Sequence, residues 1–484
     1  MVGIPSPELT PDVEQMLVAE RIGNVCLFAR NLRDSTAGRD LCNSLQALAE
    51  RELPAPMLIA TDQEGGPVQR LSAGATPLPS AMALGAAGPA ACRQVAYIAA
   101  RELRAVGITM AFAPVLDVNV DPRNPVIGIR SFGDSPELVA ACGVASIAGL
   151  QSGGVAATAK HFPGHGDTAV DSHLALPVLP HDLPRLERVE LIPFRAAIEA
   201  GVDAVMVSHL AVPALDPSGA PASLSPELNS GLLRRRLRFG GVVCTDCMEM
   251  SGARTGRLGF GELAVRAFLA GADLVLVSHR RDRQLAASAA LRDAVESGRV
   301  PVMRLRESAS RVLKLKRRLA AAPAPPWTEV GSAAHLATVT EAAVRAVTVK
   351  RRESLPGGTT AVIAFGGAAL SPAEPQVQTD HFLEAARALG LATLALPVEP
   401  DAQVEARALR FARSVDVLVV GSRRLAAVPR QAELTRALAS LRPVALVALR
   451  EPYDLDRVPE AATLVAAYGD TAPQARAALA AALD

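Results

Sequence analysis

The chain has 484 residues, half of them hydrophobic, and its 50 lysines and arginines almost balance its 49 aspartates and glutamates. The resulting net charge of +1 gives no electrostatic footprint for nucleic acid or an anionic membrane, and it suits a small neutral or zwitterionic substrate. No run of 18 apolar residues is free of charge or punctuation, and the first residues lack the pattern of a signal peptide. The six cysteines are scattered, as in a reducing compartment. We therefore expect a cytoplasmic protein, a monomer or weak dimer, with no membrane or nucleic-acid partner.

The first 315 positions alternate short apolar runs with longer helical stretches. The runs are continuous in hydrophobicity, as expected of parallel strands buried on both faces. They are Val2–Ile4, Val25–Phe28, Met57–Thr61, Ala111–Leu116, Val155–Ala159, Ala204–Ser208, Val242–Thr245 and Leu274–Ser278. Eight strands, each followed by a helix, fit a (β/α)₈ TIM barrel better than a doubly wound sheet. The first run begins almost at Met1, so we expect either a trimmed barrel or a start that lies upstream.

A second αβ pattern follows a proline-rich segment that ends at Trp327. We predict a barrel over residues 1–319, a linker over 320–331 and a smaller α/β sandwich over 332–484. In the last segment a helix over Ala333–Val349 precedes five apolar runs, and no cluster of histidines and aspartates is present. The pair Gly366-Gly367 resembles a phosphate turn only weakly. We expect this second domain to be noncatalytic.

The stretch Lys160–His173 holds three of the eight histidines and lies where an apolar run ends. Its proline and glycines exclude a regular helix, so a strand should lead into a long loop here. Polar chemistry this dense on a loop after a buried strand is typical of an active site. In an extended loop Asp171 would face the same way as His173 and could orient its ring. A histidine held by a carboxylate is a usable general acid/base near neutral pH.

Polar residues close most of the predicted strands, and the carboxyl ends of barrel strands are where function lies. Asp246 follows a buried strand, and its carboxylate could be a nucleophile, a metal ligand or an N-cap. Long cationic donors and an acceptor carboxylate around it would suit a hydroxyl-rich substrate or form a buried ion-pair network. This set comprises Asp62, Arg70, Arg130, Lys160 and His161.

A metal site is an alternative interpretation of the same stretch, because histidine and aspartate are metal-ligand types. The candidates are His161, His165, Asp167, Asp171 and His173. There is no H-E-x-x-H motif, and Lys160 beside the cluster would repel a cation. The C-x-x-C formed by Cys244 and Cys247 has no second pair. We therefore expect neither a metal nor another cofactor.

The ordered motifs of this sequence resemble glycoside hydrolase family 3, and more narrowly its β-N-acetylhexosaminidase branch. The similarity covers about residues 1–320 strongly and the remainder weakly. It is carried by Lys160–Thr168 with Asp171-Ser172-His173, Asp62–Gly66 with Arg70, Ala113–Asp117, Ile127–Gly133 and Val243–Asp246.

The resemblance implies a role for each matching residue. Asp246 matches the nucleophile that forms a covalent glycosyl-enzyme, His173 the general acid/base and Asp171 the partner that tunes it. The −1 subsite positions are matched by Asp62, Arg70, Arg130, Lys160, His161 and, less closely, His209. The sequence departs from bacterial recycling enzymes after the nucleophile, where Cys247–Met250 stands in place of a second aspartate and Leu-Ser-Met.

The expected activity is that of a retaining exo-β-N-acetylglucosaminidase. The resemblance implies peptidoglycan-derived muropeptides or chito-oligosaccharides as its small carbohydrate substrates. Four alternatives stay open at this point: an N-acetyl-β-glucosaminide phosphorylase, another β-glycosidase, a catalytically inactive sugar-binding protein, and a metal-dependent hydrolase.

Overall fold

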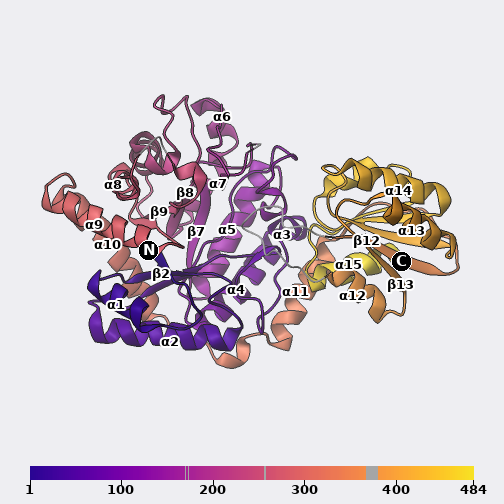
Figure 1. The fold of residues 1–484 in the computed structure, drawn as a ribbon, viewed down its shortest axis with the longest axis horizontal. Helices are drawn as coiled ribbons and strands as arrows, with labels where there is room; N and C mark the ends of the chain where they lie inside the picture. The colour runs from indigo at the N-terminus through magenta and orange to yellow at the C-terminus, as the bar shows by residue number, and fades with distance from the viewer. Residues whose placement is uncertain (169, 173, 255–257, 367–379) are drawn as a thin grey trace.

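A parallel β-barrel forms the first part of the chain in the computed structural model, which describes residues 1–168, 170–172, 174–254, 258–366 and 380–484 (Figure 1). Within these residues eight strands follow one another around the barrel: β1 (Val2–Gly3), β2 (Asn24–Leu27), β3 (Leu58–Thr61), β6 (Met110–Ala111), β7 (Ala156–Phe162), β8 (Ala204–Val207), β9 (Val242–Cys247) and β10 (Leu274–Leu276). A parallel bridge between Val2 and Val277 brings the last strand back to the first. The predicted (β/α)₈ fold is therefore confirmed.

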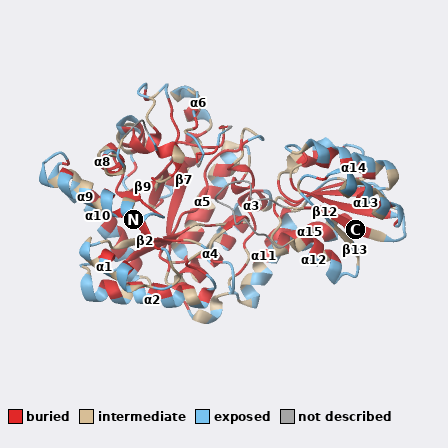
Figure 2. Cartoon of the chain, viewed as in Figure 1, coloured by how far each residue is buried: buried red, intermediate tan, exposed pale blue. Residues whose placement is uncertain are grey.

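Alternation along the strands explains why their sequences are hydrophobic throughout. In β2, Cys26 faces the core inside the barrel, whereas Val25 and Leu27 face the surrounding helices. In β3, Ala60 points inward and Ile59 outward. Successive strand residues point to opposite faces, so a barrel buried on both faces needs apolar residues at every position. The strands are accordingly buried along their length, and the exposed residues lie on the outer helix faces (Figure 2).

Helices surround the barrel and alternate with its strands. They are α1 (Pro11–Ala19), α2 (Ser35–Glu52), α4 (Pro89–Val106), α5 (Pro136–Ser152), α6 (Leu183–Arg188), α7 (Leu191–Glu199), the π-helical η3 (Glu227–Arg236), α8 (Phe260–Ala270), α9 (Arg281–Glu296) and α10 (Val302–Ala321). Additional short elements lie in the connections: β4 (Gln63–Gly65), β5 (Val68–Gln69), α3 (Ala81–Ala87), and the 3₁₀ turns η1 (Gly128–Arg130), η2 (Ala222–Leu224), η4 (Ser251–Ala253) and η5 (Trp327–Glu329). No helix in the described part of the chain is long and apolar enough to cross a membrane.

Between α6 and α7 the chain turns at Glu190, which is buried and paired with Arg185 at 2.8 Å. Two predicted elements have different boundaries in the structure. The strand predicted to run on to Leu116 ends at Ala111. The last residues of the helix predicted over Ala333–Val349 enter an antiparallel strand instead, because β-branched residues there pair with the sheet edge.

The second domain is a six-stranded sheet between two layers of helices (Figure 1). In spatial order its described strands are β11 (Thr348–Arg351, antiparallel), β16 (Thr463–Ala466), β15 (Val444–Ala448), β14 (Val417–Ser422), β12 (Thr360–Phe365) and β13 (Ala392–Leu396). One face packs on α13 (Ala402–Arg413) and α14 (Pro429–Leu441), and the other on α12 (His381–Ala388) and α15 (Ala472–Leu483). The predicted α/β sandwich is confirmed.

Three features join the two domains. Helix α11 (Ala333–Ala346) packs against α3 and α4 of the barrel and against α15 of the second domain. Asn119, after β6, donates a hydrogen bond of 3.0 Å to the Tyr453 hydroxyl in the 3₁₀ turn η6 (Pro452–Arg457). The Ser80 hydroxyl donates to the Tyr468 carbonyl. The second domain therefore lies against the side of the barrel that carries the loop after β6.

Candidate active site

A cavity of about 580 Å³ opens at the carboxyl ends of the barrel strands, where a TIM barrel carries its site. Asp246 and five predicted sugar-binding residues line it together: Asp62, Arg70, Arg130, Lys160 and His161. These residues come from four different strands and the connections that follow them. The lining also includes the apolar side chains of Phe28, Phe112, Met206 and Leu276. The cavity therefore combines apolar side chains with a charged network. We call this network, which consists of Asp62, Glu64, Arg70, Arg130 and Lys160, the charged grip.

Glu64 is the centre of the charged grip. It follows Asp62 in the β4–β5 hairpin, and its side chain is only 3% exposed. Its carboxylate accepts two hydrogen bonds from Arg130, at 2.8 and 2.9 Å, and lies 2.6 Å from Lys160 Nζ. Lys160 Nζ also donates to Asp62 at 2.7 Å, and Arg70 lies 3.9 Å from Asp62. The network fixes the positions of both cations before any ligand binds.

Opposite charges within this network keep Glu64 and Lys160 ionised despite their burial. Burial by itself would raise the pKa of Glu64, but Arg130 and Lys160 lower it well below its usual value. Burial would lower the pKa of Lys160, but Asp62 and Glu64 raise it. Opposite charges at hydrogen-bond distance thus outweigh the desolvation of each group. The grip can offer ammonium and guanidinium donors and a carboxylate acceptor to the hydroxyls of a ligand.

Asp117 organises the first turn of the predicted active-site stretch. Its buried carboxylate lies 2.7 Å from His161 Nδ1 and accepts the backbone N–H of His165 at 2.7 Å. Because the Asp117 carboxylate is at Nδ1, the other ring nitrogen of His161, Nε2, points away from Asp117. The His161 ring lines the cavity. Gly166 follows in this turn, and a Cβ there would collide with the Val118 carbonyl. The turn therefore requires glycine in order to pack against the loop after β6.

His165 also lines the cavity and is 2% exposed. Its Nδ1 lies 2.7 Å from the Thr168 hydroxyl, whereas its Nε2 has no hydrogen-bond partner among the described residues. Burial lowers the pKa of His165 to about 4, so the ring is neutral at pH 7. A buried polar atom that faces a cavity is normally satisfied by water or ligand. His165 is therefore placed to contact a bound molecule.

Asp246 lies near the end of β9, after the fully buried Thr245. Its Oδ1 accepts the backbone N–H of Cys247 at 2.7 Å, and the residue lines the cavity. Cys244 is buried in the barrel core, whereas Cys247 lines the cavity, and both are free thiols. Positions three apart in a strand face opposite ways, so the two cysteines of the C-x-x-C do not form one site.

The loop after β7 also contributes to the lining of this cavity. Asp171 is buried, and its neighbour Ser172 lines the cavity and accepts the backbone N–H of Gly252 at 2.9 Å through its carbonyl. The predicted acid/base, His173, lies outside the described residues. Closer to the start of the loop, Asp167 lies 2.6 Å from His181 Nε2. Three of the metal-ligand candidates in this stretch thus have different side-chain partners: His161 lies against Asp117, His165 against Thr168 and Asp167 against His181.

His209 occupies a different environment from the other predicted substrate contacts. It is completely buried, with Nδ1 2.7 Å from the Ser223 hydroxyl and Nε2 2.9 Å from the Cys247 carbonyl. It is not among the described residues that line the cavity. Its ring supports the loop after β9 from behind, one residue beyond Asp246.

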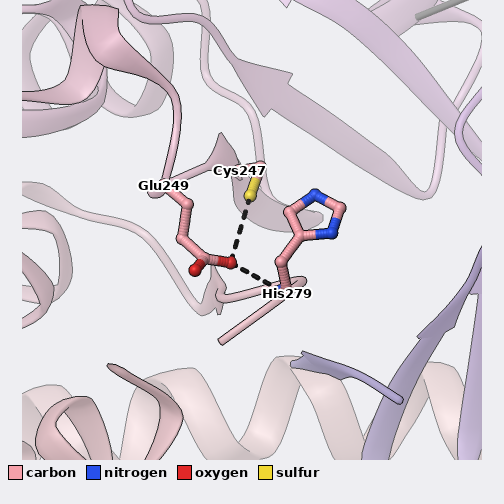
Figure 3. A group of neighbouring side chains, drawn as sticks. All are labelled: Cys247, Glu249 and His279. Carbon is pink, nitrogen blue, oxygen red and sulfur yellow. Dashed lines mark hydrogen bonds between the residues drawn. The ribbon is translucent and has the colours of Figure 1, made fainter. Parts of the chain in front are cut away.

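Cys247, Glu249 and His279 gather at the ends of β9 and β10, with potential ligand atoms within 4.8 Å of one another (Figure 3). The Glu249 carboxylate accepts the backbone N–H of His279 at 2.5 Å, and Arg283 lies 3.5 Å from it. Arg30 lies 3.2 Å from His279 Nδ1. Burial raises the pKa of the Cys247 thiol to about 11. Two guanidinium groups and a protonated thiol disfavour a cation, so we interpret the cluster as a brace between two loops.

Three residues at this site, Glu64, Asp117 and His165, were not predicted as catalytic or substrate-binding residues. Glu64 and Asp117 belong to the motifs Asp62–Gly66 and Ala113–Asp117, which come after the barrel strands β3 and β6. Their position after strands was a usable signal, but only the structure shows which cations and imidazoles they contact. His165 carried a signal only as part of a histidine-rich stretch.

Comparison with known proteins identifies the class of this barrel. The model of the glycosyl hydrolase family 3 N-terminal domain matches residues 3–315. A family 3 β-N-acetylglucosaminidase structure from Paenibacillus sp. str. FPU-7 superposes with a TM-score of 0.90 at 39% identity, covering 99% of this chain and 93% of that one. The barrel with its cavity is that of a glycoside hydrolase, and the chain belongs to glycoside hydrolase family 3.

Two curated relatives agree with this assignment. A β-hexosaminidase of Neisseria meningitidis is 40% identical over 290 residues, which are 58% of this chain and 78% of the relative. β-Hexosaminidase A of Pseudoalteromonas piscicida is 34% identical over 375 residues, or 72% of this chain. The chain matches 62% of the length of that second relative.

Proposed function

We propose that the chain is a retaining exo-β-N-acetylglucosaminidase that removes terminal N-acetylglucosamine from a small carbohydrate. The observation that carries the proposal is that Asp246 lines the same cavity as the charged grip around Glu64. The relatives named as β-hexosaminidases and the β-N-acetylglucosaminidase structure support this choice of sugar.

The mechanism assigns one group to each half of a double displacement. Asp246 attacks the anomeric carbon, and the glycosidic bond breaks as the covalent glycosyl-enzyme forms. His173, tuned by Asp171, gives a proton to the leaving oxygen and later takes one from the attacking water. Asp62, Arg70, Arg130, Lys160 and His161 hold the sugar hydroxyls in the −1 subsite. In a retaining mechanism the nucleophile and the acid/base act on opposite sides of the glycosidic bond.

We further propose peptidoglycan-derived muropeptides as the substrates, with chito-oligosaccharides as the second candidate, and a cytoplasmic location. The free thiols of the described cysteines are consistent with a reducing compartment. Assaying purified protein on an N-acetylglucosaminyl-anhydromuramyl disaccharide and on chitobiose, at equal concentrations, ranks the two substrates by kcat/KM. A higher value for chitobiose would replace the first substrate by the second.

The reaction class is tested with aryl β-glycosides of glucose, N-acetylglucosamine, N-acetylgalactosamine and xylose. We expect the N-acetylglucosaminide to turn over fastest and its first sugar product to be the β-anomer by NMR. No turnover of any glycoside would indicate an inactive binding protein. Sugar 1-phosphate formed in phosphate buffer would indicate phosphorolysis, and an α-anomer as the first product would exclude retention.

A further inference from the structure

A second cavity of about 580 Å³ lies between the two domains. The barrel provides one wall through residues 122–129 of the loop after β6. The second domain provides the other through residues 424–427, after β14, and residues of the segment 451–457, after β15. Neither domain alone can form this cavity.

The two large cavities share a wall. Val126 and Ile127 line both of them, and Asn124 holds these two residues by accepting their backbone N–H groups at 2.9 and 2.8 Å. The same Asn124 side chain donates to the His165 carbonyl at 2.8 Å. Arg130 donates from Nη1 to the Val126 carbonyl at 2.9 Å. A group bound in the interdomain cavity would therefore contact the loop that positions Arg130 in the catalytic cavity.

Two arginines of the second domain, Arg424 and Arg457, line the interdomain cavity. Among the described residues neither guanidinium group forms a hydrogen bond or an ion pair, whereas Arg123 is paired with Asp121. Arg424 does lie near Asp454: burial raises the pKa of that carboxyl to about 6, and the charge of Arg424 opposes the rise. Of the acidic residues in the lining, Asp456 is paired with Lys350, which faces it at 2.6 Å. The remaining acidic lining residues are Glu451 and Asp454. Unpaired guanidinium groups at a concave surface are suited to a carboxylate or phosphate.

Asp454 gives the cavity a buried acceptor. It is 1% exposed, and its Oδ1 accepts the backbone N–H of Ala426 at 3.2 Å. Its Oδ2 has no hydrogen-bond partner in the described part of the chain. A buried, unsatisfied carboxylate oxygen is costly, and a hydroxyl donor from a ligand would remove that cost.

We propose that the interdomain cavity is a second, noncatalytic binding site for a sugar acid or sugar phosphate. Arg424 and Arg457 bind its anionic group, and Asp454 accepts a hydrogen bond from one of its hydroxyls. Because the loop at 122–130 forms part of both sites, occupancy of this cavity also strengthens sugar binding in the catalytic cavity. Such coupling is reciprocal, so the binding of each ligand strengthens the binding of the other.

Calorimetric titration of the full chain tests this site directly. The probes are N-acetylmuramic acid, which carries a carboxylate, and N-acetylglucosamine 6-phosphate, with neutral glucose as the control. Each titration is repeated with the catalytic cavity saturated by N-acetylglucosamine. We expect at least one acidic probe to bind under both conditions, and to bind severalfold tighter in the second, while glucose does not bind.

Variants locate the binding. We expect the Arg424→Ala/Arg457→Ala double variant to bind the acidic probe about tenfold more weakly, because a charge-assisted hydrogen bond to its anionic group is lost. The matched control Arg410→Ala/Arg476→Ala removes two exposed arginines of the same domain and should leave its affinity unchanged. Asp454→Asn should lower the affinity for the acidic probe severalfold and should fold like wild type.

Three results would overturn the proposal. They are the absence of binding by both acidic probes, competition with N-acetylglucosamine, and equal affinity in the Arg424→Ala/Arg457→Ala variant. If N-acetylglucosamine itself failed to bind, the proposed function would be in question, but the interdomain site would still be judged by the two variants.

Discussion

Both domains bury a network of charged side chains at the ends of their parallel strands. In the barrel, Glu64 joins Arg130 and Lys160. In the second domain, Asp470 lies 2.9 Å from Arg423 and 3.6 Å from Arg450, and both arginines are almost completely buried. The two networks are alike in burial and charge.

What differs is where the networks lie. Glu64, Arg130 and Lys160 line the cavity that contains Asp246. Neither Arg423, Arg450 nor Asp470 is among the residues that line the two large cavities. Buried ion pairs at strand ends are therefore not evidence of a site by themselves, because they also hold loops in place. A site requires the same chemistry beside a cavity and a reactive group.

Removing the reactive group should give the largest effect. We expect Asp246→Ala to lower kcat/KM for an aryl N-acetyl-β-glucosaminide by about 10⁴-fold, because no glycosyl-enzyme can form. Added azide should restore turnover and give the α-glycosyl azide. Asp293→Ala, on an exposed face of α9, is the control and should be fully active. Retention of full activity in Asp246→Ala would show that another group is the nucleophile.

Neutralising the centre of the barrel network should give the next effect. Glu64→Gln leaves Arg130 and Lys160 with less compensating charge, so we expect kcat/KM to fall about 100-fold, mainly through KM, and stability to fall by about 3 kcal/mol. Exposed Glu50→Gln is the matched control. If Glu64→Gln lost stability with an unchanged KM, the barrel network would have only a structural role, like the network around Asp470 in the second domain.

The pH dependence of stability should change in the same variant. Because the pKa of Glu64 is lowered on folding, its ionisation stabilises the fold above the usual value of 4.5 and loses that effect as the pH falls below it. Urea unfolding of wild type should therefore weaken more steeply between pH 7 and pH 3 than unfolding of Glu64→Gln.

The second network should respond in stability alone. Asp470→Asn leaves two buried guanidinium groups with less charge compensation, and we expect a loss of about 3 kcal/mol in the free energy of unfolding. Kinetic constants for the aryl glycoside should match those of wild type, since Asp470 lines neither large cavity. A hundredfold loss of kcat/KM in folded Asp470→Asn would remove the distinction between the networks.

Much of the fold was predictable because each strand is a short continuous apolar run bounded by turns. The predicted run Ala204–Ser208, for example, differs by one residue from β8. The edge strand β11 was not predictable, because it follows a helix without a break and its pairing partner, β16, lies more than a hundred residues further on. Local patterns report burial and period, whereas edge pairing depends on distant residues.

The site was predictable to the extent that its residues close strands. Asp62, Lys160 and Asp246 do so, and they line one cavity. Sequence patterns could not separate His161, which lines the cavity, from the fully buried His209, because both come just after an apolar run. The ring environment is decided by residues from other strands, namely Asp117 and Ser223.

The smallest effect is expected at His165, a buried residue that lines the catalytic cavity and whose Nε2 has no hydrogen-bond partner among the described residues. We expect His165→Phe, which keeps the ring and removes both nitrogens, to raise KM about tenfold with a smaller change in kcat. The pKa of His165 falls from 6.5 to about 4 on folding, so its neutral form is favoured in the fold. Wild type should therefore lose stability as the pH falls from 6.5 toward 4, whereas His165→Phe should lose less over that interval. A variant that reproduced the shallower pH profile with an unchanged KM would make His165 a packing residue, enclosed like those around Asp470. A raised KM would instead add it to the groups that hold the sugar.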